Sequence, residues 1–462
     1  MSVAPRLVIT SNRVLRSPAA PAAPGTIIVD KASGKIVEIL DTVKTRQDFG
    51  EEIAHQEDFV EAGDNVVMPG VVDAHVHINE PGRTHWEGFA TATKAAAAGG
   101  VTTLIDMPLN SIPPTTTVEN LHVKTDAARG QTYVDVGFYG GVIPTNVNDL
   151  IPLVKEGVKG FKCFMIESGV DEFPCVNEEE IAAAMEKFQE TDSVFMFHAE
   201  QDCGDIPKPE GMDPKAYNTF LHQRPQLLET NAIRTIIKLA KQYPKVRCHI
   251  VHLSAADALP MIRQAKADGV RLTVETCPHY LSLNSEIVPE GATEYKCCPP
   301  IREDENREKL WEALKEGTID YVVSDHSPCV VELKLMEAGD FVGAWGGIGG
   351  LQFGIPVVWT EARRRGCTIQ DLTKWQSFNT ARQVGLGGIK GSIAVGADAD
   401  FVIWNPDETF IITKEIIEFK NKVTPYMGRT LHGVVKETFV RGQKVWTKGK
   451  ITSEVALGKL LL

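Results

Sequence analysis

The feature of this sequence that most constrains its fold is a repeated alternation, through the middle of the chain, of short apolar segments with longer amphipathic ones. A short apolar run bounded by turn residues predicts a buried strand, and an apolar period of 3.6 residues predicts a helix. Strands are predicted at 71–77, 101–107, 133–139, 160–164, 194–198, 246–252, 271–275 and 321–324. Helices are predicted between several of them, at 88–98, 178–190, 229–241, 256–268 and 306–315.

Strands that alternate with helices form a parallel sheet, and this pattern favours an α/β chain whose sheet closes into a (β/α)8 TIM barrel. The alternative is an open, doubly wound sheet. Such sheets commonly carry a G-x-G-x-x-G turn after the first strand, and no such turn follows the first strand predicted here. We therefore expect the barrel.

The two ends of the chain differ from the middle, because they contain short strands separated by turns and no helical period. The predicted strands are 6–12, 25–29, 35–40 and 58–60 at one end, and 400–404, 431–441 and 443–446 at the other. We expect the two ends to meet in one small β-sandwich module. The expected division is 1–68 with 388–462 for this module and 69–387 for the catalytic barrel.

Composition argues against several classes of function. The chain of 462 residues has a net charge of −13, which does not suit a nucleic acid or an anionic membrane as partner. No apolar run reaches the ~18 residues of a membrane span. Residues 1–24 lack the basic segment and apolar core of a secretory signal. Nine cysteines in no framework spacing indicate reduced thiols, so we expect a cytoplasmic protein.

The first predicted barrel strand ends with two histidines on one face. Val76 separates His75 from His77, and residues i and i+2 of a strand point to the same side. Two imidazoles held together at a strand end are a ready pair of metal ligands. An ordinary strand with two surface histidines has the same pattern, so this interpretation depends on matching ligands elsewhere.

Other predicted barrel strands carry residues that could complete such a site. Lys162 lies within the fourth strand, His198 ends the fifth, His252 ends the sixth and Asp325 follows the eighth. The carboxyl ends of barrel strands meet at one rim, where barrel enzymes place their chemistry. A single strand-end histidine is more often structural, but a buried lysine without a partner is rare. Together these residues predict a metal site at the rim.

The remaining histidines are expected to support the site or to take no part in it. His85, His279 and His326 lie near the rim but out of register with the ligands, so a supporting role is plausible for them. No catalytic role is expected for His55, His122, His222, His249 and His432. The glycine-rich segment 346–350 lacks the context of a phosphate loop, and we expect a flexible loop over the site.

These residues give the chain a resemblance to the cyclic amidohydrolases, the family that includes dihydroorotase, hydantoinase (dihydropyrimidinase) and allantoinase. The resemblance covers essentially the whole chain, and within the family its motifs most resemble those of allantoinases. They are HVHINEPGRTHWEGF (75–89), AAAAGGVTTLIDMPLNSIPPTT (95–116), GFKCFM (160–165), TCPHY (276–280), KCCPPIR (296–302) and VVSDHSPC (322–329).

The resemblance implies a centre of two divalent metal ions, with zinc first and cobalt or manganese as alternatives. The implied ligands are His75, His77 and Asp325 for one ion, His198 and His252 for the other, and Lys162, carboxylated on its amine, as the bridge. The ions would activate a water molecule, and Asp325 would accept its proton and pass it to the leaving ring nitrogen. The resemblance also implies a homo-oligomer, with a tetramer as the usual assembly.

One position discriminates among members of the family. Where dihydroorotases typically carry an arginine for the substrate carboxylate, this chain has Asn79, whose amide cannot act as a bidentate cation. A neutral substrate such as allantoin fits better, and its ring opening to allantoate is a step of purine degradation. Candidate substrate contacts are Asn79, Arg83, Asn110 and backbone groups near Cys298, although Arg83 could instead form a structural salt bridge. A hydantoinase or dihydropyrimidinase, and a non-catalytic scaffold similar to dihydropyrimidinase, remain as alternatives.

Overall fold

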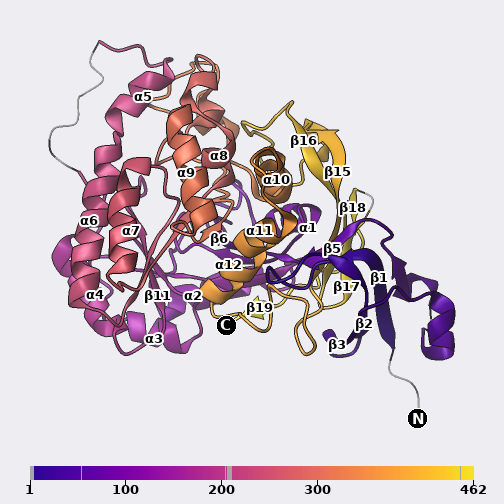
Figure 1. Cartoon of the computed structure of the whole chain (residues 1–462). Helices are drawn as coiled ribbons and strands as arrows, with labels where there is room; N and C mark the ends of the chain where they lie inside the picture. The colour runs from indigo at the N-terminus through magenta and orange to yellow at the C-terminus, as the bar shows by residue number, and fades with distance from the viewer. Residues whose placement is uncertain (1–4, 54, 203, 205–210, 448) are drawn as a thin grey trace.

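The predicted barrel is present in the middle of the chain (Figure 1). The computed structural model describes residues 5–53, 55–202, 204, 211–447 and 449–462. The barrel strands are β6 (Val71–Val76), β7 (Val101–Asp106), β8 (Asp135–Phe138), β10 (Phe161–Phe164), β11 (Val194–His198), β12 (Arg247–Ile250), β13 (Leu272–Thr276) and β14 (Tyr321–Val322). Their pairings are all parallel, as the alternation with helices predicts.

Two short links complete the ring of strands. The third strand bends, so that β8 pairs with β7 while its continuation β9 (Gly140–Gly141) pairs with β10. On the other side, Val76 and His326 form a parallel bridge, and His77 N donates to His326 O at 2.8 Å. This closure brings His77 and Asp325 to neighbouring positions at the carboxyl end of the barrel.

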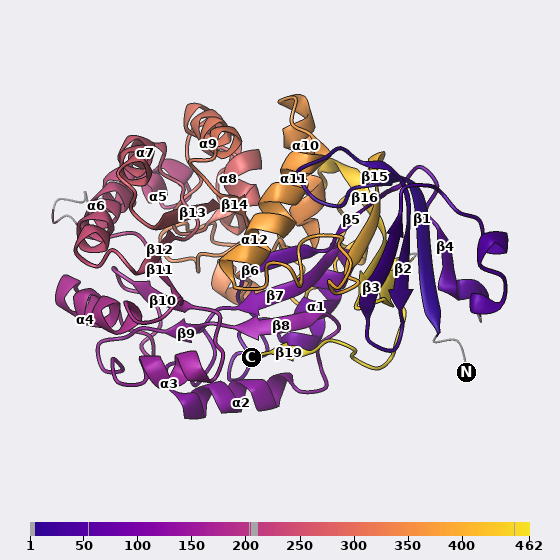
Figure 2. The ribbon, with the colours of Figure 1, turned by 60° about the horizontal axis from the view of Figure 1, so that its bottom comes forward.

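Helices surround the barrel, as Figures 1 and 2 show. They are α1 (Phe89–Ala98), α2 (Val118–Ala128), α3 (Leu150–Lys155), α4 (Glu178–Phe188), α5 (Tyr217–Gln223), α6 (Gln226–Gln242), α7 (Leu259–Ala267), α8 (Pro278–Ser282), α9 (Asp304–Glu316), α10 (Gly354–Arg364), α11 (Ile369–Thr373) and α12 (Asn379–Gln383). The helices predicted from the sequence correspond to α1, α4, α6, α7 and α9. A capping box begins α4, since Asn177 and Glu180 each accept a hydrogen bond from the other's backbone N–H.

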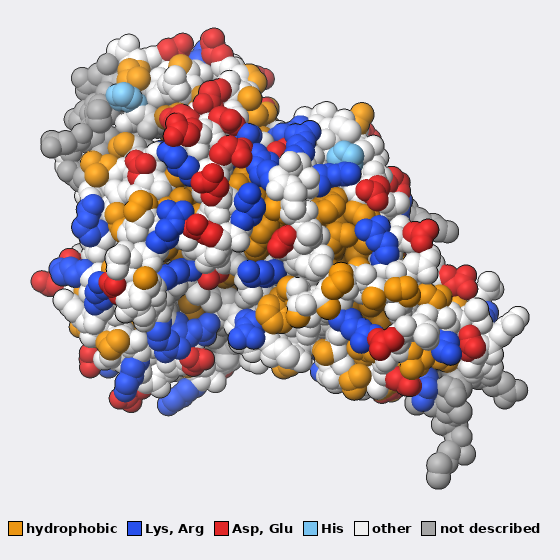
Figure 3. All heavy atoms as spheres, viewed as in Figure 1, with side chains coloured by type: hydrophobic (Ala, Val, Ile, Leu, Met, Phe, Trp, Pro, Cys, Tyr) orange, Lys and Arg blue, Asp and Glu red, His pale blue; other side chains and the backbone are white. Residues whose placement is uncertain are grey.

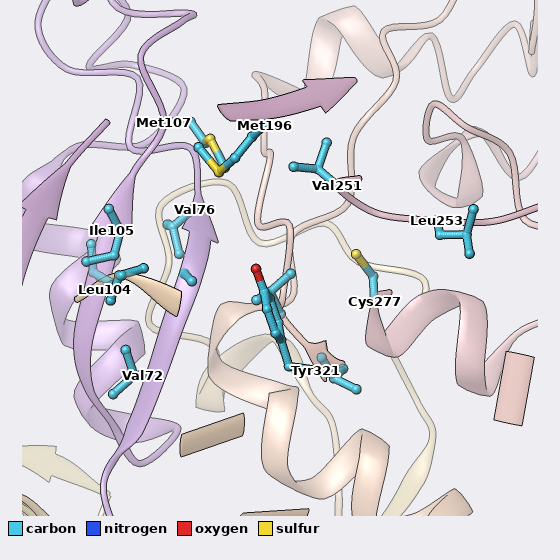
Figure 4. Close-up of a cluster of buried hydrophobic side chains, with 14 of the residues drawn as sticks. Val72, Val76, Leu104, Ile105, Met107, Met196, Val251, Leu253, Cys277 and Tyr321 are labelled. Atoms are coloured by element: carbon cyan, nitrogen blue, oxygen red, sulfur yellow. The ribbon is translucent and has the colours of Figure 1, made fainter. Parts of the chain in front are cut away.

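The face of β6 opposite the histidines packs into the apolar core. Val72 and Val76 alternate with His75 along the strand and lie beside Leu104 and Ile105 of β7 (Figure 4). All four apolar side chains are 0% exposed. Full burial of such a side chain contributes about 1.5–3 kcal/mol. The alternation that points the histidines to one side therefore also anchors their strand.

Both ends of the chain form one sheet beside the barrel, in the order β18-β17-β16-β15-β5-β1-β2-β3, with β4 paired to β1. The strands are β1 (Arg6–Val14), β2 (Ala23–Asp30), β3 (Lys35–Leu40), β4 (Phe59–Glu61), β5 (Val66–Pro69), β15 (Phe401–Ile411), β16 (Thr430–Val440), β17 (Gln443–Thr447) and β18 (Lys450–Ile451). The sheet curls, so that Ile9 and Ile27 share a buried cluster with Phe401 and Phe439. Because β5 pairs with β15, we propose 1–68 with 388–462 as one domain and 69–387 as the other.

A buried ionic group, which we call the junction cluster, joins this module to the barrel. Asp135 is the first residue of β8, and Asp398 and Asp400 precede β15. The Lys390 ammonium lies 2.8 Å from Asp135, 3.0 Å from Asp398 and 2.6 Å from Asp400, and Arg441 also pairs with Asp135. The Lys390 ammonium occupies the position among the three carboxylates where a metal ion would bind. The junction cluster is therefore no candidate for a metal site. The short strand β19 (Leu460–Leu461) pairs with β8 beside it.

The charged surface and the cysteines have the features that the composition predicts. Acidic and basic side chains are interspersed over the face shown in Figure 3. In the described parts of the chain, no helix combines the length and the hydropathy needed to cross a membrane. Eight cysteines are free thiols, and the ninth, Cys203, lies outside the described residues.

Candidate active site

The predicted metal ligands meet in one pocket at the carboxyl ends of the barrel strands. The pocket has a volume of about 400 Å³, and its lining includes His77, Lys162, His198, His252 and Asp325. His75 lies behind this lining, 0% exposed. The structure thus brings together side chains from five separate strand ends, as their positions in the sequence predict.

His75, His77 and Asp325 form one half of the set. Asp325 Oδ1 lies 3.1 Å from His75 Nε2 and 3.5 Å from His77 Nε2. With bonds of 2.0–2.1 Å, two ligand atoms of a tetrahedral ion lie roughly 3.3 Å apart, so this spacing suits a metal ion. Burial lowers the pKa of His77 to about 3, which leaves its lone pair available. Burial opposes ionisation of Asp325, but His75 holds the pKa of this carboxyl well below its ordinary value.

His75 is flanked by two carboxylates. Its Nδ1 lies 2.5 Å from Glu275 Oε1, and its Nε2 faces Asp325. Burial and Lys162 act to lower the pKa of His75, but Asp325 and Glu275 raise it overall. A cation is therefore favoured at Nε2, where a metal ion would compete with a proton.

Glu275 is a functional candidate that sequence analysis missed. It is 1% exposed, and besides His75 it accepts hydrogen bonds from His252 N at 3.2 Å and from His249 Nε2 at 3.0 Å. Burial opposes its ionisation, but His75 and His249 lower its pKa to about 2. The Glu275 carboxylate therefore orients the His75 ring and the backbone at His252, and His249 holds the carboxylate in place. The available signal was a glutamate inside the apolar strand β13.

His198 and His252 form the second half of the set. His198 Nε2 lies 2.6 Å from Glu200 Oε2 and donates to it, so Nδ1 presents a lone pair 3.1 Å from His252 Nε2. Burial lowers the pKa of both histidines, so both rings are neutral. Two ring nitrogens that face each other at this distance are favourable when a cation lies between them. Glu200, whose role the sequence did not indicate, fixes the tautomer.

Lys162 is the member of the set that needs a chemical change to act as a ligand. It is 1% exposed, and its Nζ lies 3.2 Å from His75 Nε2. No carboxylate of the described residues forms an ion pair with it. Burial lowers the pKa of Lys162, although a protonated amine would still have no lone pair for a metal. The other donors fit divalent metal ions as they stand.

Backbone strain is concentrated at this site. Of the six described non-glycine residues with positive φ, four lie here: Asn79 at 66°, Asn110 at 68°, His252 at 37° and Asp325 at 44°. Such conformations are costly for residues with side chains and persist where the surroundings impose them. The strained residues therefore indicate that the fold fixes the backbone at the rim, which is consistent with a functional site.

The four candidate substrate contacts divide into two groups. Asn110 and Cys298 line the pocket, whereas Asn79 and Arg83 do not. Asn79 is 1% exposed and donates to a backbone carbonyl beyond β14 at 3.2 Å. Arg83 pairs with Glu172 and donates to Asn110 O at 2.8 Å. Arg83 thus forms the structural salt bridge that sequence analysis left open, and it also holds the loop of Asn110.

The glycine-rich segment 346–350 lies against the pocket, as expected, and buried lysines hydrogen-bond to the chain at and just before it. Lys296 and Lys334 are buried and donate to backbone carbonyls between residues 342 and 347. Gly347 has φ 143°, and a Cβ there would lie 2.1 Å from a backbone oxygen. These contacts place the segment in the pocket wall, and its flexibility stays a prediction.

Two further histidines lie behind the rim. His326 Nε2 is 3.0 Å from Glu87 Oε2, and its Nδ1 accepts from Gly350 N at 3.1 Å, so it ties the glycine-rich segment to the barrel. His279 is buried, and neither of its ring nitrogens has a hydrogen-bond partner in the part of the chain that is described. A nitrogen of His279 lies within 4.8 Å of an Asp325 oxygen. His326 therefore has the supporting contacts that its position suggested.

Comparisons with known proteins agree with this geometry. A profile described as the amidohydrolase family matches residues 66–445. An allantoinase of Streptomyces avermitilis is 49% identical over 446 residues, covering 96% of each chain, and an allantoinase of Saccharomyces cerevisiae is 46% identical over 462 residues, covering 98% of each. A mitochondrial allantoinase of Aquarana catesbeiana is 52% identical over 83% of this chain and 76% of its own. The solved L-hydantoinase (dihydropyrimidinase) of Arthrobacter aurescens has a TM-score of 0.89 at 29% identity, covering 98% of this chain and 99% of its own.

Proposed function

The chain belongs to the amidohydrolase family, and we propose that it is a metal-dependent allantoinase, which hydrolyses the ring amide of allantoin to give allantoate. The observation that carries this function is the identity of nearly half of the chain to allantoinases from a bacterium and a yeast, over almost the full length of each. The pocket supports it, because a metal-ligand set opens into a cavity of a size suited to a small molecule.

We propose that the pocket holds two divalent metal ions, with zinc first and cobalt or manganese as alternatives. His75, His77 and Asp325 would hold one ion, and His198 and His252 would hold the other. The spacings between the ligand atoms, 3.1–3.5 Å, support this assignment. Bound ions would lower the pKa of a water molecule and polarise the ring carbonyl.

The bridge between the ions is proposed to be Lys162, carboxylated on its amine. The neutral amine would attack carbon dioxide, so that an N–C bond forms as one C=O π bond opens. The nitrogen then passes a proton to water, which leaves a carbamate with two oxygens that can act as ligands. Within the described residues Lys162 is buried without a carboxylate partner, and a buried charge without a partner is costly. Carboxylation supports the bridge, because it replaces this uncompensated cation by an anion. Lys162→Ala should lose metal and activity, and a short carboxylic acid should partly restore both. Full metal content and activity in Lys162→Ala without added acid would contradict the bridge.

Asp325 is the proposed general base and acid. Its carboxylate would take the proton of the attacking water and return it to the ring nitrogen as the C–N bond breaks. The group is ionised at neutral pH, because His75 holds its pKa below the ordinary value, so an oxygen able to accept the proton is present. The strained backbone at Asp325 supports a fixed orientation toward the pocket.

Asn110 and Cys298 are the proposed contacts to the substrate ring, since both line the pocket. We propose that Asn79 and Arg83 act from behind its wall. Asn79→Arg should reduce allantoin turnover more than metal content, because it inserts a cation into a buried position. Equal hydrolysis of dihydroorotate and allantoin by the wild type would contradict the choice of a neutral substrate.

A hydantoinase or dihydropyrimidinase is the second candidate, favoured by the structural likeness to the Arthrobacter aurescens enzyme. The scaffold alternative has less support, because five of the six ligand positions carry side chains that can bind metal as they stand, and Lys162 can do so once it is carboxylated. The deciding experiment measures metal content and the turnover of allantoin, hydantoin and dihydrouracil on one preparation. We expect two metal ions per chain and the highest kcat/KM with allantoin. A higher kcat/KM with hydantoin or dihydrouracil would select the second candidate.

Assembly and location complete the proposal. We propose a homo-oligomer, with a tetramer as the first choice, and a cytoplasmic location, which the eight free thiols support. Light scattering after gel filtration tests the assembly, and cell fractionation tests the location. Recovery in a mitochondrial fraction, in line with the name of the frog relative, would overturn the cytoplasmic assignment.

A further inference from the structure

Two neighbouring residues on the pocket wall present polar groups that the protein itself does not use. Gln223 is the last residue of α5, Arg224 follows it, and both line the pocket. No described residue forms a hydrogen bond with the Gln223 amide. Arg224 donates through Nε and Nη2 to Glu200, and its Nη1 has no acceptor in the described ranges.

The local sequence explains why two consecutive side chains reach one pocket. Pro225 follows Arg224, and a residue before proline is disfavoured in the helical region. Arg224 accordingly leaves the helix, with φ −128° and ψ 63°. The backbone therefore turns at Arg224. The two side chains do not point 100° apart around a helix axis, as consecutive residues of a continuing helix would.

Arg224 is held in place before any substrate arrives. Its two bonds to Glu200 measure 3.0 and 2.6 Å, and Glu200 is fully buried against His198. Arg224 Nε and Nη2 face the two different oxygens of the Glu200 carboxylate, which is the bidentate geometry of a paired guanidinium and carboxylate. The guanidinium charge is thus balanced, and the wall offers a hydrogen-bond donor without net charge.

Several other polar side chains of the pocket already form hydrogen bonds within the protein. The Ser168 and Ser327 hydroxyls donate to backbone oxygens at 2.6 and 3.0 Å, and the Lys296 ammonium donates to two backbone carbonyls. Glu167 accepts from Cys175 at 3.5 Å. Gln223 and Arg224 are therefore consecutive residues of the described lining that offer an unused amide and an unused Nη1 donor side by side.

We propose that Gln223 and Arg224 form the subsite for the ureido arm of allantoin. The arm carries one carbonyl oxygen beside a terminal NH₂ group, so it needs a donor and an acceptor side by side. Arg224 Nη1 donates to the carbonyl oxygen, and the Gln223 amide oxygen accepts from the NH₂ group. The inference rests on the proposed function, because the arm reaches this wall only when the ring lies at the metal ligands. A neutral wall of this kind suits a ureido group and not a carboxylate.

The test compares allantoin with hydantoin, which has the same ring and no arm. Gln223→Met removes the acceptor and keeps a similar length. The ratio of kcat/KM for allantoin to kcat/KM for hydantoin should fall by about tenfold, the size of one neutral hydrogen bond. Gln242→Met is the matched control, because Gln242 is the exposed last residue of α6 and does not line the pocket. If hydantoin turnover is too slow to measure, its inhibition constant against allantoin replaces kcat/KM in the ratio.

Each outcome decides one question. A lower ratio in Gln223→Met, with the ratio of Gln242→Met unchanged, supports the subsite. An unchanged ratio in Gln223→Met overturns it, including the case in which both substrates lose the same factor, which indicates a structural role. Failure of the wild type to hydrolyse allantoin overturns the proposed function itself, and it is seen before any variant is made.

Discussion

Two groups of buried charged residues lie at opposite ends of the barrel, and they differ in how their charges are compensated. In the junction cluster, Lys390 contacts three carboxylates, and Arg441 and Lys35 provide further cations. At the rim, Lys162 has no carboxylate partner among the described residues, and ring nitrogens of His198 and His252 face each other at 3.1 Å.

This difference indicates that the junction cluster stabilises the fold and that the rim residues bind a ligand. Buried polar groups in native proteins nearly always have partners, so a group left without one needs an explanation. The junction cluster satisfies its own charges and connects β8 with the segment before β15. The rim cluster would reach the same balance with the proposed carbamate on Lys162 and cations bound between the ligand atoms. Variants at the two ends should therefore change different measured quantities.

The largest effect on stability is expected at the junction cluster. Lys390→Met leaves three buried carboxylates without their shared cation, and breaking a buried pair costs about 3–5 kcal/mol. Urea denaturation should show a loss of this size in the free energy of unfolding. Lys436→Met is the control, because its ion pair with Glu408 is exposed and contributes at most about 1 kcal/mol. A loss in Lys390→Met no larger than in the control would contradict the comparison.

The next largest effect is expected at Asp325, and it should appear in turnover. Asp325→Asn keeps the shape of the side chain and removes the proton acceptor, so kcat should fall by at least about 10²-fold. The unfolding midpoint of the metal-free protein should stay close to that of the wild type. Metal content is measured on the same sample, because Asp325 is also a proposed ligand. A kcat within a few-fold of wild type would remove Asp325 from the mechanism.

A smaller effect is expected at Glu275, which contacts the ligand segments and not the substrate. Glu275→Gln removes the charge that orients His75, so metal affinity should fall by about 10–100-fold. Competition with a chelator measures this change independently of turnover. Glu38→Gln, on the exposed side of β3, should leave metal affinity unchanged. Equal affinity in Glu275→Gln and wild type would show that the rim holds its ligands without this carboxylate.

The smallest effect concerns the pH dependence of stability at the junction cluster. Burial raises the pKa of Asp398, but Lys390 and Lys35 outweigh it, so this pKa lies below its ordinary 3.8. Its contribution is therefore present above pH 3.8 and is lost as the pH falls through the folded-state pKa. Asp398→Asn should be less stable than wild type by at most about 1 kcal/mol at pH 6. Urea denaturation at pH 6, 4, 3 and 2.5 should show this difference unchanged down to about pH 4 and shrinking below it, whereas a difference that stays constant over the whole series would contradict the assignment.

Much of the fold was predictable, because its signals are local. The strand 194–198 has the bounds that its apolar run predicts. Helix α10 was missed because Gly354 and Pro356 lie in its first turn, where the sequence resembles a loop. Helix α2 was missed because Val123 is 42% exposed while Lys124 is buried against Asp106, which inverts the usual period.

The candidate site was predictable to the extent that it lies at strand ends. The six ligand positions follow from the order of strands along the chain. The residues behind them do not, because Glu275 acquires its role from His75, 200 positions away in the sequence. Arg83 was ambiguous for the same reason, since Glu172 becomes its neighbour only in the folded chain.

The pairing of β5 with β15 has a consequence for the synthesis of the protein. Met68 lies opposite Val402, and ribosomes add about 5–20 residues per second, so the roughly 330 residues between them take on the order of 17–70 s to make. During that interval the edge of β5 that β15 will cover has no partner, and an unpaired edge readily pairs with another chain. Production of the native protein is therefore favoured by conditions that protect nascent chains, such as lower temperature, slower expression or an abundant holding chaperone.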